Sequence, residues 1–332
     1  MSFTDKKPVI AVTMGDINGV GPEIAVKAAL SSELAEICRP VFIGSARAAA
    51  RAAALLGAAA DIRICGAPEE ALFRPDTINI IETGIYDENS LTPGQIQEIS
   101  GRMSVDFIRR AIELGMAGRV GAVATAPINK QAIKLAGVAE PGHTEIFEAG
   151  TGSKQALTMF QCGRLRVFFL SRHVSLQRAL SLVTRANIRD YLEKAHTELL
   201  ALGIKNPRIA VAALNPHSGD NGLFGDEEGR EITPAVEDAR ARGINCVGPV
   251  PADSVFHLAK NGSFDAVLSL YHDQGHIACK TLDFERTVSL TLGLSFLRTS
   301  VDHGTAFDVA WSGTASAVSM IEAIAVAAQY AK

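Results

Sequence analysis

The stretch F-D-A-V-L-S-L-Y-H-D-Q-G-H-I-A-C-K, residues 264–280, joins an apolar run to a short segment rich in ionisable side chains. The run over 264–270 is typical of a strand buried in a parallel sheet. In open α/β sheets, ligands bind beyond the carboxyl ends of the strands. The stretch therefore predicts a parallel α/β fold with His272 and Asp273 at the sheet edge where sites form. The alternative for a single histidine is a structural role, such as capping the strand.

The same alternation of apolar strand and helical pattern recurs along the whole chain. Short runs rich in β-branched residues occupy 9–13, 41–43, 78–81, 122–125, 167–170 and 209–213. They predict βα units and largely parallel sheets. The segment T-P-G-Q at 92–95 predicts a helix over 93–117 with Thr92 as its N-cap. A stretch of small apolar residues predicts a last helix near 315–331.

Length and composition limit the possible classes of protein. A chain of 332 residues is longer than one hydrophobic core usually grows, so we expect two domains or two lobes. Apolar residues make up 47% and charged residues 20%, which is typical of an α/β enzyme. The net charge of −4 provides no basic face for nucleic acid or for an anionic membrane, so we expect neither as a partner.

The cysteines and the N-terminus indicate the compartment. The five cysteines are scattered and form no C-x-x-C pair, which argues against both a disulfide framework and a thiolate metal site. The N-terminal residues lead into a strand without the apolar core and cleavage site of a signal peptide. No stretch is long and apolar enough for a spanning helix. We expect a cytoplasmic protein.

Three predicted strands each end in a histidine. His272 follows one apolar run, His173 follows F-L-S-R at 169–172, and His217 follows L-N-P at 214–216. Because strand ends of a parallel sheet meet at one edge, these histidines predict a shared divalent metal site, the alternative being three structural histidines. Imidazole ligands favour zinc, with cobalt and nickel next and manganese or magnesium as further alternatives.

Three further motifs suit anions or nucleotides. The glycine-rich turn M-G-D-I-N-G-V-G-P-E-I at 14–24 stands between a strand and a helix, but it matches neither the Rossmann nor the P-loop spacing. In P-G-H-T-E at 141–145, the Thr144 hydroxyl and nearby amides could hold a phosphate or carboxylate, or Thr144 could be an ordinary cap. The segment 298–308 offers Arg298 for an anion and a turn for a nucleotide.

Taken in order, the motifs G-D-I-N-G-V-G-P-E, T-A-P-I-N-K, P-G-H-T-E, N-P-H-S-G, Y-H-D-Q-G-H, T-L-G-L-S-F-L-R-T-S and D-H-G-T-A-F-D resemble the 4-hydroxythreonine-4-phosphate dehydrogenase family. The resemblance covers nearly the whole chain. It implies a two-lobed α/β/α fold of the isocitrate and isopropylmalate dehydrogenase type and not a Rossmann domain. The implied lobes are a nucleotide-side lobe of 1–130 plus 290–332, and a metal, substrate and dimerisation lobe of 131–289.

The resemblance also implies residue roles. It makes the protein a homodimer with its active site at the subunit interface, one metal-binding histidine coming from the other subunit. Asp273 and Lys280 are implied as catalytic, and His276 has no implied role. The implied ligands are His173, His217 and His272 for the metal; His143, Thr144, Lys280, Ser289 and Arg298 for the substrate; and His303, Gly304, Thr305 and Asp308 for NAD.

The implied activity is metal-dependent oxidation by NAD of a secondary hydroxyl in a small 4-phosphorylated hydroxy acid, followed by decarboxylation. Biosynthetic members serve pyridoxine biosynthesis and carry asparagine where this chain has Ser289. The segments N-G-L-F-G-D-E-E at 221–228 and Y-H-D-Q-G-H-I resemble instead a catabolic branch acting on threonate or erythronate 4-phosphate. The alternatives are a terephthalate cis-dihydrodiol dehydrogenase, for which Arg172 could bind an extra carboxylate, and a non-catalytic metal- or nucleotide-binding homologue. NADP in place of NAD stays open.

Overall fold

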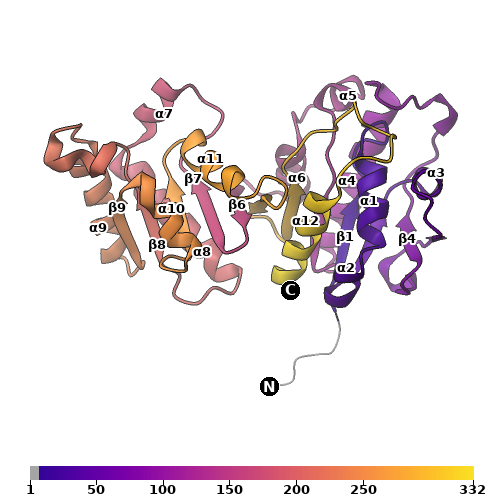
Figure 1. Cartoon of the computed structure of the whole chain (residues 1–332), viewed down its shortest axis with the longest axis horizontal. Helices are drawn as coiled ribbons and strands as arrows, with labels where there is room; N and C mark the ends of the chain where they lie inside the picture. The colour runs from indigo at the N-terminus through magenta and orange to yellow at the C-terminus, as the bar shows by residue number, and fades with distance from the viewer. Residues whose placement is uncertain (1–6) are drawn as a thin grey trace, which may run out of the picture. The chain divides into compact units, whose positions relative to one another are not determined.

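The computed structural model describes residues 7–332 (Figure 1). The chain folds into two compact units. Unit 1 comprises the chain up to Ala156 together with Thr291–Lys332, and unit 2 comprises Leu157–Leu290. The predicted functional lobes, with a boundary near 130, stay a prediction. In unit 1, residues 131–156 include helices α5 (Lys130–Leu135) and α6 (His143–Thr151), which pack on α4 (Glu98–Met116). Burial of their apolar faces against α4 assigns this segment to unit 1.

Unit 1 contains a parallel sheet. Its strands follow the order β3-β4-β2-β1-β5-β12, and each pairs in parallel with its neighbours. The predicted α/β class is confirmed, whereas the isocitrate dehydrogenase type stays a prediction. The strands are β1 (Val9–Thr13), β2 (Arg39–Ile43), β3 (Asp61–Ile64), β4 (Thr77–Ile81), β5 (Ala122–Thr125) and β12 (Leu297–Val301), with β11 (Val288–Leu292) where the chain passes between the units.

Two groups of helices cover this sheet. Helix α12 (Val318–Tyr330) packs on β12, β5 and β1, and its Ala323 and Ala327 are fully buried, which allows close approach. Helix α1 (Gly21–Ala29) contacts α12, α3 and β4. Helix α4 packs on β1, β5 and β2 and carries α5 and α6. The other elements are α2 (Ser32–Ile37), α3 (Ala46–Leu55) and the 3-10 turns Pro68–Glu70 and Glu88–Ser90.

Helix α4 starts later than predicted. Thr92 is not its N-cap; the helix begins at Glu98 after Gln97. Gly94 has a left-handed φ of +73°, which an α-helix cannot accommodate. Its N–H donates to the Asn18 carbonyl at 2.8 Å, and the Gln97 side-chain oxygen accepts from Asn18 Nδ2 and the Thr92 N–H, each at 2.8 Å. Residues 92–97 therefore bind the glycine-rich turn, and this tertiary contact overrides the local helix signal.

Unit 2 has a mixed sheet in the order β6-β7-β10-β8-β9. Strands β7, β10 and β8 are parallel, as predicted. Strand β9, which was not predicted, is parallel to β8, and β6 and β7 form an unpredicted antiparallel pair. Cys162 pairs with Leu165, so the hairpin turn consists of Gly163 and Arg164, with Gly163 at a φ of +56°. The strands are β6 (Leu157–Cys162), β7 (Leu165–Phe169), β8 (Ile209–Ala212), β9 (Cys246–Val250) and β10 (Ala266–Ser269).

Helices α10 and α11 form the core of unit 2 with the sheet. Val255 and Ala259 of α10 and Cys279 of α11 pack against Phe169 and Val267. Apolar side chains from both helices thus fix the position of α11, the helix that begins at His272. The helical elements are α7 (Leu176–Leu182), α8 (Arg185–Ala201), α9 (Thr233–Ala241), α10 (Ala252–Lys260), α11 (His272–Leu282), the 3-10 segment η3 (Pro216–Gly222) and the π-helical segment η4 (Glu228–Ile232).

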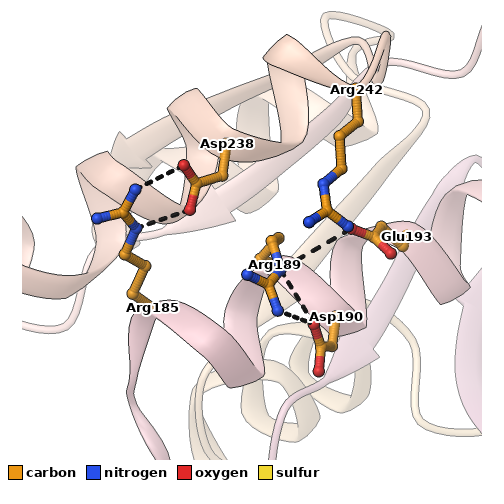
Figure 2. A network of polar contacts seen from close by, with 6 residues as sticks. All are labelled: Arg185, Arg189, Asp190, Glu193, Asp238 and Arg242. Carbon is orange, nitrogen blue, oxygen red and sulfur yellow. Dashed lines mark hydrogen bonds and ion pairs between the residues drawn. The ribbon is translucent and has the colours of Figure 1, made fainter.

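Charged side chains link α8 with α9 and the residue that follows it (Figure 2). Arg185 donates two hydrogen bonds of 2.6 Å to the Asp238 carboxylate and thereby lowers the pKa of that carboxyl group. Glu193 binds Arg242 and lies 3.9 Å from Arg189. Such exposed ion pairs contribute little stability because water screens them.

The other expectations from composition concern cysteines and membrane spans. All five cysteines are buried, and none is in a disulfide bond. Burial raises the pKa of Cys38 to about 12, which makes its thiol unreactive. None of the helices formed by residues 7–332 has the length and apolar character needed to cross a bilayer.

Replacement of Gly101 by alanine tests the packing of α4 on α5. A Cβ at this position would lie 2.1 Å from the Ala132 carbonyl oxygen. Alanine normally stabilises a helix relative to glycine, but here we expect a loss of about 1–3 kcal/mol in the free energy of unfolding, measured with urea. The control is Gly229→Ala, where no atom lies within 4 Å of the added Cβ. Unchanged stability of Gly101→Ala would contradict this packing.

Candidate active site

Arg298 of β12 is a buried cation in unit 1. Its Nε and Nη2 donate to the Thr125 hydroxyl at 3.1 and 2.7 Å, and its Nη1 donates to the Thr291 hydroxyl at 3.1 Å. The side chain is almost inaccessible, and within residues 7–332 no carboxylate forms an ion pair with it. Burial lowers the pKa of Arg298 to about 9, although the charge of Glu145 opposes this. A buried guanidinium held only by hydroxyl groups is suited to receive an anion.

His143, the first residue of α6, lies beside this cation. The Arg298 guanidinium is 5.5 Å from the ring centre of Phe147, and that ring is 6.4 Å from the His143 ring. His143 is partly exposed as a residue, but its Nε2 atom is buried and has no hydrogen-bond partner in the described part of the chain. Burial and the Arg298 charge lower the pKa of His143 well below its usual value. One bound anion would satisfy both groups.

The glycine-rich turn lies in the same unit. Asp16 is buried there, and its Oδ1 accepts the Asn18 N–H at 2.9 Å. Burial raises the pKa of Asp16 to about 6, against the opposing effect of hydrogen bonds from Asn18 and Ser100. The carbonyl of Thr305 accepts the Val20 N–H at 3.0 Å. The segment that the sequence predicted for the nucleotide therefore packs directly on the turn.

Two side chains, those of Ser171 and Gln274, join the ends of three strands in unit 2. The Ser171 hydroxyl, after β7, donates to the Leu270 carbonyl at 3.0 Å, after β10. The Gln274 side chain accepts the Leu270 N–H at 2.7 Å and donates to the Ala213 carbonyl at 2.8 Å, after β8. The ends of β7, β10 and β8 are thereby held together. These are the strands that precede His173, His272 and His217.

His272 has the hydrogen bond expected of a metal ligand. Its Nδ1 lies 2.6 Å from Asp273 Oδ1, and because a carboxylate accepts, Nδ1 carries the proton and Nε2 is left to bind an ion. The rings of His173 and His272 are 6.1 Å apart between centroids. This pair and its donor set fit a divalent metal. Within residues 7–332 of one chain, however, no three His, Cys, Asp or Glu side chains form a metal-binding group, so His217 does not complete the pair.

His217 lies in a loop with unusual backbone angles. His217, Ser218, Asp220 and Asn221 all have φ between 43° and 56°, a left-handed conformation that costs about 1 kcal/mol or more per residue. The buried Glu228 carboxylate stabilises the start of the loop by accepting the backbone N–H groups of residues 214 and 215 at 2.8 and 2.6 Å. Strain of this kind occurs at functional sites more often than elsewhere.

The remaining predicted residues are placed as follows. Lys280 of α11 is partly buried, with its ammonium group 5.0 Å from the Phe284 ring centre. Ser289 lies two residues before Thr291 in β11, and residues two apart in a strand face the same side. Arg172 lies near Tyr191. Burial raises the pKa of the Tyr191 phenol to about 12, and the positive charge of Arg172 opposes this rise. Thr144 is partly buried in the first turn of α6, while Gly304 and Asp308 are exposed.

Comparison with known proteins identifies the family. The family model described as pyridoxal phosphate biosynthetic protein PdxA matches residues 36–327. The chain belongs to this family. It is 52% identical over 327 residues, 98% of each chain, to a protein of Symbiobacterium thermophilum named "Putative D-threonate 4-phosphate dehydrogenase".

Solved structures are similar to the chain over nearly its whole length. The structure of 4-hydroxythreonine-4-phosphate dehydrogenase from Klebsiella pneumoniae is 43% identical, with a TM-score of 0.91 over 98% of this chain and 100% of the other. A terephthalate 1,2-cis-dihydrodiol dehydrogenase from Burkholderia xenovorans LB400 is 26% identical, with a TM-score of 0.67 over 97% and 98%. The predicted resemblance to this family is therefore confirmed.

Several residues of these clusters were not predicted individually. Thr125, Gln274 and Glu228 each lie inside a motif that the sequence singled out, but no role was assigned to them. Their side chains act on groups that are distant in sequence: Thr125 binds Arg298, and Gln274 binds the Ala213 carbonyl. Only the presence of a polar residue in a family motif could have indicated them. Their partners depend on the tertiary structure.

The Asp16→Asn variant tests the raised pKa of Asp16. A carboxyl group whose pKa is about 6 when folded and 3.8 otherwise contributes full stability below pH 3.8 and loses it as the pH rises through about 6. Asparagine stays neutral and can still accept the Asn18 N–H. We expect the stability of the variant relative to wild type to increase by about 1–1.5 kcal/mol between pH 5 and pH 7.5, measured by urea unfolding. A pH-independent difference would show that Asp16 has an ordinary pKa.

Proposed function

We propose that this chain is a divalent-metal-dependent NAD oxidoreductase that acts on a small 4-phosphorylated hydroxy acid. The substrates we propose are threonate or erythronate 4-phosphate, or 4-phosphohydroxythreonine, with decarboxylation after oxidation. The names of the relatives from Symbiobacterium and Klebsiella support this substrate class. The non-catalytic alternative is less favoured, because the buried cation and the histidine pair described above are both present.

One observation carries the proposal, namely the buried Arg298 beside the unpartnered Nε2 of His143. The free energy cost of burying a cation without a counter-ion is several kcal/mol, and a bound phosphate or carboxylate offsets it. A dianion near His143 also favours its protonated form, so the imidazole can donate a second charged hydrogen bond. The adjacent Thr144 lies at the N-terminus of α6, where helix amide groups favour negative charge.

The residues around the glycine-rich turn fit the nucleotide. A Cβ on Gly19 would lie 2.8 Å from the Thr305 carbonyl, so glycine is needed for the 303–308 segment to pack there. This contact fixes the backbone of that segment while Gly304 and Asp308 stay exposed to a ligand. We propose that His303, Gly304, Thr305 and Asp308 contact NAD. The Arg298 cluster is left for the substrate.

The proposed chemistry needs a metal-binding site and a proton route. A bound zinc or cobalt ion would lower the pKa of the substrate hydroxyl. His173 and His272 would hold the ion, and Asp273 orients His272 through the 2.6 Å hydrogen bond. Bound NAD would accept a hydride from the substrate carbon, and the hydroxyl proton would pass to solvent. When carbon dioxide leaves from a carboxylate β to the new ketone, a proton replaces it at carbon, and Lys280 is the proposed donor.

We also propose a cytoplasmic homodimer in which the partner completes the metal site. Two ligands of one chain leave the usual set of three protein ligands incomplete. A cavity of about 610 Å³ lies between α10 and α11 and is lined by Asp273, next to the histidine pair. Ile277 of α11 is 62% exposed, and Phe284, two residues after the end of α11, is 60% exposed. Partner atoms would cover these apolar side chains. The five unpaired cysteines suit a reducing compartment.

The test is NADH formation by the full chain with threonate 4-phosphate, 4-phosphohydroxythreonine and a carboxylated cis-dihydrodiol. We expect turnover of a phosphorylated acid only, with loss on chelation and recovery with zinc or cobalt. In Thr125→Val, two hydrogen bonds to Arg298 are lost, so kcat/KM for the phosphorylated acid should fall about 10- to 100-fold, with KM for NAD unchanged.

Thr125→Ser is the matched control, because it keeps the hydroxyl group and should retain most of the activity. Turnover of the dihydrodiol alone would reject the phosphorylated substrate. Equal activity of the valine and serine variants would show that Arg298 does not depend on Thr125.

A further inference from the structure

His276 lies directly beneath the proposed metal ligand His272. The two residues are one helical turn apart at the start of α11, so their side chains lie on the same face. Their rings are stacked, with centroids 3.7 Å apart and planes 11° from parallel. No role follows for His276 from the sequence or from the functional proposal above.

The surroundings of His276 fix its ring. Phe160 of β6 and Phe169 of β7 contact it at centroid distances of 4.4 and 4.3 Å. Its Nδ1 lies 2.9 Å from the His272 carbonyl oxygen, which only accepts, so Nδ1 carries the proton and donates. Gly275 allows this close approach of the helix, since a Cβ there would be 2.6 Å from the Phe169 ring.

The contacts form a column that runs from the core to the site. At the inner end are the two phenylalanine rings on the sheet, then comes His276, and at the outer end is His272, whose side chain is 41% exposed. Asp273 holds one edge of the His272 ring by its hydrogen bond to Nδ1, but a single bond leaves the ring free to rotate about it. Stacking on His276 removes that freedom.

We propose that His276 is a positioning residue that holds the His272 imidazole in the orientation needed for metal binding. This inference rests on the proposed metal-binding role of His272. It assigns to His276 a part that a carbonyl or carboxylate usually plays for a ligating histidine, but through ring stacking instead of a hydrogen bond to the ring. The alternative is that His276 only fills space between the helix and the two phenylalanines.

The experiment is cobalt binding to the full chain after removal of metal with a chelator. Affinity is measured by titration calorimetry, and coordination is followed by the visible absorption of cobalt. His276→Leu keeps apolar volume but removes the ring, and we expect cobalt affinity to fall about 10- to 100-fold. His276→Phe restores a ring, and we expect its affinity to lie within about threefold of wild type. Circular dichroism of each metal-free variant establishes that it is folded.

A control variant separates this inference from the functional proposal. His272→Ala should lose cobalt binding; if it binds like wild type, the proposed metal site itself is wrong. If His272→Ala loses binding while His276→Leu binds like wild type, only the positioning role of His276 is rejected. Equal losses in His276→Leu and His276→Phe would also overturn it, because ring stacking would then not be the cause.

Discussion

The side-chain amide of Gln274 links parts of unit 2 that are far apart in sequence. It binds the backbone after β10 and after β8, while Ser171 joins the end of β7 to β10. Parallel strands bring their carboxyl ends to one edge, but they leave the backbone groups beyond the last pair unpaired and free to separate. The three hydrogen bonds close this edge. They thereby fix the starting points of the segments that carry His173, His217 and His272.

In unit 1, the central constraint is the buried positive charge of Arg298. Arg298 projects from β12 into the interior of unit 1, and the hydroxyl groups of Thr125 and Thr291 orient it without neutralising it. The neighbouring His143 is kept uncharged by the same burial and by the positive charge. The positive charge of Arg298 thus has no counter-ion within residues 7–332. We propose that an anionic ligand supplies this counter-ion, which would offset the cost of a polar arrangement inside a hydrophobic unit.

The residues around Arg298 and the histidines of unit 2 differ in the backbone that supports them. The Arg298 cluster sits on strands and the first turn of a helix, whose backbone positions are fixed by regular hydrogen bonding. His217, in contrast, depends on a left-handed loop stabilised by the buried Glu228 carboxylate. The support of His272 is intermediate in rigidity, because this residue begins helix α11 and its ring stacks on that of His276. The precision of each group follows from the rigidity of its support.

The sequence by itself determined the α/β class, most of the parallel strands, the family and the residues at the strand ends, because period, turn chemistry and motif order are local properties. It did not determine that α4 starts at Glu98, that 131–156 belongs to unit 1 or that β6 and β7 are antiparallel. It also assigned no partner to Arg298 or His276. These features are decided by contacts between distant segments, such as Asn18 with Gln97, Thr125 with Arg298 and Phe160 with His276. Such contacts exist only once the chain has folded, because their energy depends on burial and geometry that no local pattern specifies.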